Sequence, residues 1–599
     1  MSDSEASNAD NGDLRRIYIG HANTIHDPAV AIVEEDRVFA EGFERHTQCK
    51  RAWEIQRLWY SWRAIRSALM HLELWPVKDA HVVSATSWDF DLLKEVEKKR
   101  LMEFAEQGDV SMMTHHLEME PIFNRQMAWI LRSYPAHFNA QPHEIAPEMF
   151  QDVHNIAMET KMVNHHLAHA ATAVYTSPFE ECVVMIIDGY GEGTTTSFYH
   201  YHDNRFDLIH QQGIYSLGLL YSYITELCGF SSLEGEEWKI MGLAAYGSFQ
   251  QEIYDLFKGL VVFDGLKFEM KYDVGTFFPT LMSLMGGMRH PDDPNVMRVA
   301  DLAHNFQRFF EETVVQLARS AGDLGLSKNL AYGGGCALNS SANGKILEST
   351  AFERLHIPSA PADDGCALGA ALYEKNRGNG VGARARFTSP YLGSRMDMAR
   401  LEKMLGFGGI RYHHLPDEKD LCQEVAGLLD GGNIVGWIQG RAEFGPRALG
   451  NRSILADPRP ADMKDRINSR VKFREDYRPL APSILHEFGG DYFENYQESP
   501  YMERTLKFRE AVKDTIPAVV HQNGTGRLQT VKEEWNPRYY RLIRAFYEKT
   551  GIPLLLNTSF NVMGKPIVHS VEDAITVFFT TGLDYLVIGD YLLMKGRAS

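Results

Sequence analysis

Residues 182–199 read CVVMIIDGYGEGTTTSFY, and this stretch decides the fold class. An apolar run that ends in Asp188 is followed by a glycine-rich turn and a second β-type run, which predicts two paired strands. A similar order occurs near the N-terminus, where short β runs precede an amphipathic helix over residues 55–72. These runs are Ile17–Gly20, Ala29–Val33 and Val38–Phe43. Strands followed by helices, twice in one chain, predict two related α/β lobes.

The overall composition narrows the class of protein. The chain has 599 residues, with 61 basic and 79 acidic side chains and a net charge of −18. This acidic balance disfavours a nucleic-acid or anionic-membrane binder, which needs a positive field. The apolar runs are far shorter than the ~20 residues of a membrane helix. Six cysteines without a CxxC pair fit a reducing compartment, so we expect a cytoplasmic enzyme.

Two segments predict the domain boundaries. Residues 1–14 are polar and acidic, which predicts a disordered tail and not a signal peptide. The glycine-rich, basic segment Lys375–Arg386 has no apolar period and predicts a linker. We therefore expect one domain over residues 15–380 and a second over residues 387–599.

A histidine motif, NHHLAHAA from Asn164, is the first candidate site. On a helix His165 and His169 lie one turn apart on the same face, where two imidazoles can bind one divalent cation. The alternative is a histidine cluster satisfied in the core. Asp188 and the pair Asp363–Asp364 could complete a His2Asp2 site for iron, manganese or zinc, although a turn aspartate and an N-cap are the simpler interpretations.

Two glycine-containing stretches are weaker signals. Gly333, Gly334 and Gly335 follow a β run, and backbone amides in such a loop can approach a phosphate. A plain loop is the alternative. The stretch EEWKIMGLAAYG from Glu236 cannot be distinguished, from its residues, from a helix with a glycine kink.

Basic residues gather in residues 439–452 and 472–479, beside glycines and prolines. Guanidinium groups bind phosphate through two parallel hydrogen bonds, so an anion site is favoured. The alternative is a surface of ion pairs, because Glu443, Glu475 and Asp476 could pair with these bases. Polar residues after the apolar run Leu554–Leu556 also fall at a strand end, where α/β folds bind ligands.

Together these motifs resemble the NodU/nebramycin-synthetase type of ATP-dependent carbamoyltransferase, from Ile17 to about Gly589. The most specific stretches are GRAEFGPRALGNRSIL from Gly440, KFREDYRPLAP from Lys472, NGTGRLQTV from Asn523 and NTSFN from Asn557. The motifs HHLAHAA, KIMGLAAYG, GGGCALN and DDGCALGAA occur in the family's order in the N-terminal half.

The resemblance implies a fold and a reaction. The N-terminal part is expected to be a two-lobed actin-like ATPase domain, of the kind found in threonylcarbamoyl transferases, and the C-terminal part a YrdC-like α/β domain. The C-terminal domain would join carbamoyl phosphate to ATP, with Mg, as carbamoyl-adenylate. The N-terminal domain would transfer the carbamoyl group to a hydroxyl of a small-molecule acceptor.

The resemblance also assigns residues. His165, His169, Asp188 and Asp364 match the metal ligands, with iron as the suggested ion; we choose Asp364 over Asp363 because it directly precedes the glycine. Lys239, the loop Gly333–Gly335 and Asn339 match nucleotide-facing positions, and His26 the histidine near the transferred group. The residues that match the carbamoyl-phosphate and ATP pocket are Arg441, Arg447, Lys472, Arg474, Arg478, Arg527 and Asn557.

Departures from the family pattern leave the acceptor open. This chain has FERHTQCKR from Phe43 where the family reads close to EERFTRxKH, and Thr24 where aminoglycoside-modifying members have an acid. The acceptor pocket is expected in the divergent region of about residues 51–160. An amine acceptor and a non-catalytic nucleotide-binding regulator are the alternatives. We expect no nucleic-acid or membrane partner and leave a homodimer open.

Overall fold

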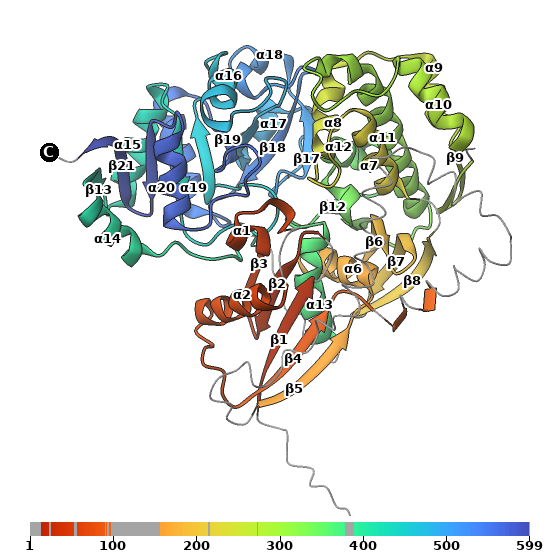
Figure 1. The fold of residues 1–599 in the computed structure, drawn as a ribbon, viewed down its shortest axis with the longest axis horizontal. Coiled ribbons are helices and arrows are strands. Elements are labelled where there is room, and N and C mark those ends of the chain that lie inside the picture. Colours follow the sequence, from red (N-terminus) through yellow and green to blue (C-terminus); the bar gives the residue numbers. More distant parts are fainter. Residues whose placement is uncertain are drawn as a thin grey trace, which may run out of the picture.

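The computed structural model describes residues 14–22, 26–52, 57–89, 91–92, 95–96, 156–213, 216–271, 274–377 and 389–597 (Figure 1). Thr24, nearly all of the predicted tail, and most of the predicted linker and acceptor region lie outside these residues.

The first lobe is built on a five-stranded sheet in the order β3-β2-β1-β4-β5. Strands β1, β2 and β3 form the predicted antiparallel meander, and β4 and β5 add to β1 in parallel. Their bounds are Arg15–Ala22 (β1), Ala29–Glu34 (β2), Arg37–Gly42 (β3), Ala80–Thr86 (β4) and Ile156–Met162 (β5). After β3 come α1 (Phe43–Thr47) and α2 (Arg57–His71), where the amphipathic helix was predicted.

The second lobe repeats this topology. Its sheet has the order β12-β11-β6-β7-β8, with β6, β7 and β8 antiparallel and β11 and β12 parallel to β6. The bounds are Cys182–Gly191 (β6), Thr194–His202 (β7), Arg205–Gln212 (β8), Asn329–Gly333 (β11) and Arg354–His356 (β12). Two sheets with the same strand order and directions confirm the prediction of two related lobes and of an actin-like arrangement.

Two helices fill the space between the lobe sheets. Helix α6 (His165–Tyr175) packs on the second sheet, α13 (Asp363–Asn376) packs on the first, and the two helices contact each other. A Cβ atom on Gly369 would lie 2.0 Å from the Ala168 carbonyl oxygen, and one on Gly20 would lie 1.8 Å from that of Ala367. The small residues of the DDGCALGAA motif therefore allow α13 to pack closely on both sides.

Helices cover the other face of the second sheet and enclose the largest apolar core of the N-terminal half. They are α7 (Leu217–Leu227), α8 (Glu237–Leu243), α9 (Gln251–Lys258), α10 (Val274–Met285), α11 (Ala300–Gly322) and α12 (Ser340–Ser349). A short hairpin, β9 (Val261–Asp264) and β10 (Lys267–Met270), lies beside them.

The C-terminal half forms one mixed sheet of nine strands, in the order β13-β21-β20-β14-β15-β19-β16-β18-β17. The bounds are Ile410–His414 (β13), Val435–Ile438 (β14), Arg452–Ala456 (β15), Ala481–Leu485 (β16), Arg504–Lys507 (β17), Thr525–Val531 (β18), Leu554–Ser559 (β19), Tyr585–Ile588 (β20) and Tyr591–Arg597 (β21). This arrangement agrees with the expected α/β domain.

Helices cover both faces of this sheet. One face packs against α15 (Glu418–Asp430) and α19 (Pro537–Thr550), and the other against α14 (Met398–Gly408), α16 (Met463–Ile467) and α20 (Val571–Thr580). Short helices α17 (Gly489–Tyr492) and α18 (Glu510–Lys513) precede and follow edge strand β17 in the chain. Edge strand β17 contacts α12, so the sheet edge joins the two halves of the molecule (Figure 1).

No helix in the described part of the chain is both long enough and apolar enough to cross a membrane.

Candidate functional site

A cavity of about 1060 Å³ lies between the two halves of the molecule. The N-terminal half contributes His26, Asp188 and Asp363 to its wall. The C-terminal half contributes a group of cations and amides: Arg447, Lys472, Arg474, Arg478, Arg527 and Asn557. Residues far apart in the sequence therefore line one cavity.

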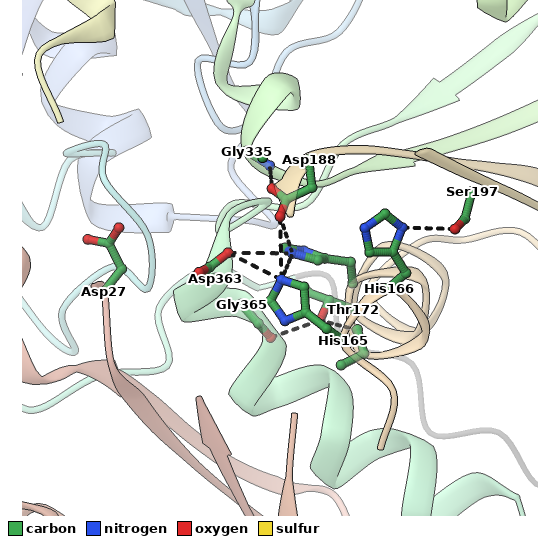
Figure 2. Close-up of polar contacts among 12 residues, drawn as sticks. Asp27, His165, His166, Thr172, Asp188, Ser197, Gly335, Asp363 and Gly365 are labelled. Carbon is green, nitrogen blue, oxygen red and sulfur yellow. Dashed lines mark hydrogen bonds and ion pairs between the residues drawn. The ribbon is translucent and has the colours of Figure 1, made fainter. Parts of the chain in front are cut away.

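A cluster of four side chains adjoins this cavity, and its two carboxylates line it. We call it the His/Asp cluster: His165, His169, Asp188 and Asp363 (Figure 2). The two Nε2 atoms of the histidines lie 3.2 Å apart. His165 Nε2 is 3.4 Å from Asp188 Oδ2 and 3.6 Å from Asp363 Oδ1. His169 Nε2 is 3.9 Å and 3.6 Å from the same two oxygens.

Local structure explains why the histidines converge. Asn164 caps α6, and its side chain accepts a hydrogen bond from the Leu167 N–H at 3.1 Å. The spacing of four residues then places both imidazoles on one helix face, as predicted. The cluster is almost fully buried, with His165 0% and His169 1% exposed.

The glycine loop supports a carboxylate of the cluster. The Gly335 N–H donates to Asp188 Oδ1 at 2.6 Å (Figure 2). Gly334 has φ of +90°, and a Cβ atom there would lie 2.3 Å from the Ile187 carbonyl oxygen. Only glycine fits such a conformation this close to the backbone of β6. In this structure the loop therefore positions Asp188, although the sequence predicted that the loop binds phosphate.

The cluster contains Asp363 where we had chosen Asp364. Consecutive helix residues point about 100° apart, so only one of this pair can face the histidines. Asp364 Oδ1 instead accepts a hydrogen bond from the Gly365 N–H at 3.0 Å. Burial, with smaller contributions from the charges of Asp27 and Glu44, raises the pKa of Asp364 to about 8.

Charges within the cluster balance one another. Burial opposes the charged form of His165, but hydrogen bonds to Asp188 and Asp363 outweigh it and hold the His165 pKa well above its usual range. Burial likewise disfavours ionised Asp363, yet His165 and His169 outweigh it and keep the Asp363 pKa well below its usual range.

The donor set fits a divalent transition metal. Two imidazole nitrogens and two carboxylate oxygens are the ligands that iron, manganese and zinc accept. Bonds of about 2.1 Å to one ion place neighbouring donors roughly 3.0–3.5 Å apart, close to the separations found here. The four side chains could therefore hold one such ion.

Two residues that sequence reasoning missed lie behind the cluster. The Glu192 carboxylate accepts hydrogen bonds from the His165 N–H at 2.9 Å and from Asn164 Nδ2 at 2.9 Å. Burial raises its pKa to about 7. The Trp88 ring lies 4.7 Å from the His165 ring. Glu192 follows Gly189–Gly191, which was predicted as a turn but ends strand β6. Nothing in the sequence pattern associated Glu192 with the histidine helix.

His166, between the two cluster histidines in the motif, has a structural role. Its Nδ1 lies 2.8 Å from Ser197 Oγ (Figure 2), and burial lowers its pKa to about 3. One histidine of the motif is thus a buried core residue, and the other two converge on the carboxylates.

His26 lines the cavity beside the cluster. Its Nδ1 is 3.0 Å from Asp27 Oδ2 and 3.6 Å from Asp363 Oδ2. Arg51 holds Asp27 in turn, with Nε at 3.0 Å and Nη2 at 2.8 Å from Asp27 Oδ2. Burial would raise the pKa of Asp27, but Arg51 and His26 outweigh it and lower that pKa to about 2.

The opposite wall carries cations. Arg447 and Arg527 have no acidic partner among the described residues. Burial lowers the pKa of Arg447 to about 10, and burial with the neighbouring charge of Arg478 lowers that of Arg474 to about 9. Charges without partners in a partly dry cavity favour an anionic ligand.

Polar neighbours hold other members of this wall. Lys472 Nζ donates to Asn561 Oδ1 at 2.6 Å and to Ser559 Oγ at 3.0 Å. Burial first, and then the charges of nearby cations, lower its pKa well below the usual range. Arg478 pairs with Glu475 at 2.5 Å, so one of the ion pairs considered as the alternative is present.

Asn557 holds the cavity wall through its amide. Its Nδ2 donates to Ser483 Oγ at 3.0 Å and to Gln529 Oε1 at 3.1 Å.

Arg441 lies elsewhere. Its guanidinium donates to backbone carbonyls of Val38 at 2.8 Å and Gly393 at 3.0 Å, and also to that of Leu392. It does not line the cavity. Arg441 therefore joins β3 to the C-terminal half, although the sequence predicted that Arg441 binds an anion.

Lys239 and Asn339 also have structural partners. Lys239 Nζ lies 2.5 Å from Glu236 Oε1 and 3.5 Å from Glu475 Oε1. Asn339 lines the cavity, but its Oδ1 accepts from the Ala342 N–H at 3.0 Å and so caps α12.

Comparisons with known proteins agree with this organisation. The family descriptions "Carbamoyltransferase N-terminus" and "Carbamoyltransferase C-terminus" match residues 18–372 and 426–595. Nodulation protein NolNO of Sinorhizobium fredii is 39% identical over 447 residues, which are 73% of this chain and 64% of that protein. The 3'-hydroxymethylcephem-O-carbamoyltransferase of Amycolatopsis lactamdurans is 33% identical over 286 residues, which are 47% of this chain and 52% of that protein. The alignments to these two relatives thus span less than two thirds of their lengths.

Solved structures are more distant. T. kodakarensis HypF is 12% identical, with a TM-score of 0.29 over 62% of this chain and 49% of that chain, a similarity too low to indicate function. The two family matches cover nearly all of both halves. The chain therefore belongs to the carbamoyltransferase family.

Proposed function

We propose that this carbamoyltransferase activates carbamoyl phosphate with ATP as carbamoyl-adenylate, and then transfers the carbamoyl group to a hydroxyl of a small-molecule natural product. The observation that carries the proposal is the shared cavity, which is lined by the carboxylates of the His/Asp cluster and by cations of the C-terminal half without acidic partners.

Activation belongs to the cationic wall. Water attacks the phosphorus of carbamoyl phosphate, the P–O bond to the carbamoyl oxygen breaks, and phosphate and carbamate form. The carbamate oxygen then attacks the α-phosphorus of ATP, and magnesium pyrophosphate leaves. Arg447, Arg474 and Arg527 would bind the phosphate oxygens, because guanidinium groups pair with them bidentately and stabilise the charge that develops in transfer.

Transfer belongs to the His/Asp cluster. The acceptor hydroxyl attacks the carbamoyl carbon, the C–O bond to AMP breaks, and the hydroxyl proton goes to His26. A metal held by the cluster would supply Lewis acidity at the carbamoyl carbonyl. Asp27 and Arg51 hold the His26 ring in place.

A hydroxyl acceptor is favoured by the relative whose name specifies a hydroxymethyl group and O-carbamoylation.

The test is pyrophosphate release from ATP by iron-loaded protein, with and without carbamoyl phosphate and with no acceptor. Release should depend on carbamoyl phosphate and be lost in Arg474→Ala. The matched control is Arg411→Ala, an exposed arginine of β13 outside the cavity, which should retain release. If the folded, metal-loaded wild-type protein releases no pyrophosphate, the proposal is wrong.

A further inference from the structure

A second group of histidine and carboxylate side chains lies where the two halves meet, outside the residues that line the cavity. Glu41 at the end of β3, His46 of α1 and His569, just before α20, each place one ligand atom within 4.8 Å of the others. His46 Nε2 is 3.0 Å from Glu41 Oε2, and His569 Nδ1 is 3.6 Å from Glu41 Oε1. We call this group the interface triad.

The carboxylate of this triad is held from behind. Ser394 donates to Glu41 twice, from its N–H at 3.1 Å to Oε1 and from its Oγ at 2.7 Å to Oε2. Glu41 is only 2% exposed, and no lysine or arginine of the described residues lies within ion-pair distance of it. Such outer hydrogen bonds are typical of carboxylates that bind a metal, because they fix the orientation of the oxygens.

The two imidazoles face the same point. Their ring centroids are 4.4 Å apart and their planes differ by 54°. Their side chains are 18% and 22% exposed, whereas the His46 Nε2 atom itself is buried. Two imidazole nitrogens, one carboxylate oxygen and one water make a tetrahedral set that suits zinc.

We propose that Glu41, His46 and His569 form a second divalent-metal site, with zinc as the ion that this donor set favours. Bonds of about 2.0–2.1 Å to a tetrahedral zinc ion place donors roughly 3.3–3.4 Å apart. The present separations of 3.0 Å and 3.6 Å lie on either side of that value, so small side-chain rotations would complete the site. The metal would link the N-terminal half to the C-terminal half independently of the reaction in the cavity.

The surrounding contacts keep the two sides of the triad together. Gln48, which follows α1, donates from Nε2 to the Ile567 carbonyl at 3.3 Å. Lys565 Nζ donates to the Gln48 carbonyl at 3.4 Å. Because His46 and His569 belong to these two docked segments, the folded protein brings both ligands together before any metal binds, which lowers the entropic cost of binding.

The experiment isolates this site by removing the first one. Full-length protein carrying His165→Gln and His169→Gln loses both the His/Asp cluster and the group that these histidines form with Cys366. It is stripped with a chelator and titrated with Zn2+ alone, and bound zinc is counted by mass spectrometry. We expect one tightly bound zinc per chain. Adding His569→Gln or His46→Gln should weaken it by at least about tenfold, whereas His413→Gln, an exposed histidine of β13, should leave it unchanged.

The opposite result is equally clear. If the protein with an intact triad binds no zinc, or binds it equally well after His569→Gln, the triad is a hydrogen-bonded contact and the proposal is wrong. If the histidine variants fail to fold, the test is instead the thermal midpoint of the protein with an intact triad, measured with and without Zn2+. A rise with added Zn2+ that EDTA reverses supports the site, and no rise overturns it.

Discussion

The two walls of the cavity handle buried charge in different ways. In the His/Asp cluster, imidazoles and carboxylates lie 3.4–3.9 Å apart, so opposite charges compensate one another without a ligand. On the opposite wall, Arg447 and Arg527 have no acidic partner in the described part of the chain, and their pKa values fall because burial disfavours the charged form.

The residues of the His/Asp cluster thus compensate one another's charge, whereas the arginines of the other wall are compensated only when an anionic ligand binds. Removing one member of a compensated cluster leaves its partners with unbalanced charge, which is costly. Removing one cation from a wall of cations relieves repulsion, so the free protein loses nothing, while ligand binding loses a strong contact. Four variants test this contrast.

Asp363→Asn should have the largest effect. It removes one carboxylate donor and leaves His165 and His169 without half of their counter-charge, so we expect metal affinity to fall by about 100-fold or more, and carbamoyl transfer to fall with it. Metal content after dialysis measures this. Asp364→Asn is the matched control, because Asp364 faces away from the histidines, and it should retain the metal. Equal loss in both variants would contradict the assignment.

Arg447→Met should separate stability from activity. Losing a charged contact to phosphate should raise the KM for carbamoyl phosphate or ATP by about 10- to 100-fold in the pyrophosphate assay. Because the side chain has no acidic partner and Arg527 loses a neighbouring positive charge, the thermal midpoint of the free protein should not fall. A clear drop in the midpoint with unchanged KM would make Arg447 a structural residue.

Arg441→Gln should give the reverse pattern. Its guanidinium donates hydrogen bonds to backbone carbonyls of β3 and of the Leu392–Gly393 segment. Because the substitution removes these bonds, we expect the free energy of unfolding to fall by about 1–3 kcal/mol. Both KM values for pyrophosphate release should stay close to those of the wild type. A KM change as large as that of Arg447→Met would show that Arg441 contributes to anion binding after all.

His521→Gln should have an effect confined to acid stability, with no change at pH 7. Burial, with the charges of Arg527 and Lys464, lowers the pKa of His521 from 6.5 to about 3. Between these values the unfolded chain binds a proton that the folded chain does not, so stability falls as pH decreases through this window. The variant should lose less stability there, by at most about 1.4 kcal/mol per pH unit. Denaturant midpoints at pH 4, 5, 6 and 7 measure this, with His413→Gln as control; identical slopes would refute the shift.

Local patterns predicted the fold class and part of the site. The meander of the first lobe, helix α6 with its histidine pair, and the strands that carry Asp188 and Asn557 follow from short-range periodicity. These features depend on residues close in the chain, where side-chain spacing and backbone geometry are linked directly.

Choices between similar neighbours could not be predicted in this way. Asp363 and Asp364 are chemically identical, and only the rotation of α13 against α6 selects the first. Arg441 and Arg447 lie in one glycine- and proline-containing stretch, yet one bonds to backbone carbonyls and the other faces the cavity.

The amino-acid sequence by itself determined the two α/β lobes, the paired imidazoles and the concentration of cations in the C-terminal half, because periodicity and composition act over a few residues. Tertiary structure alone decided which carboxylate joins the histidines, which arginines face the cavity, and that Glu41 meets His569 across the interface. The reason is physical: these outcomes depend on how helices and sheets are oriented against one another, and many distant contacts together determine that orientation.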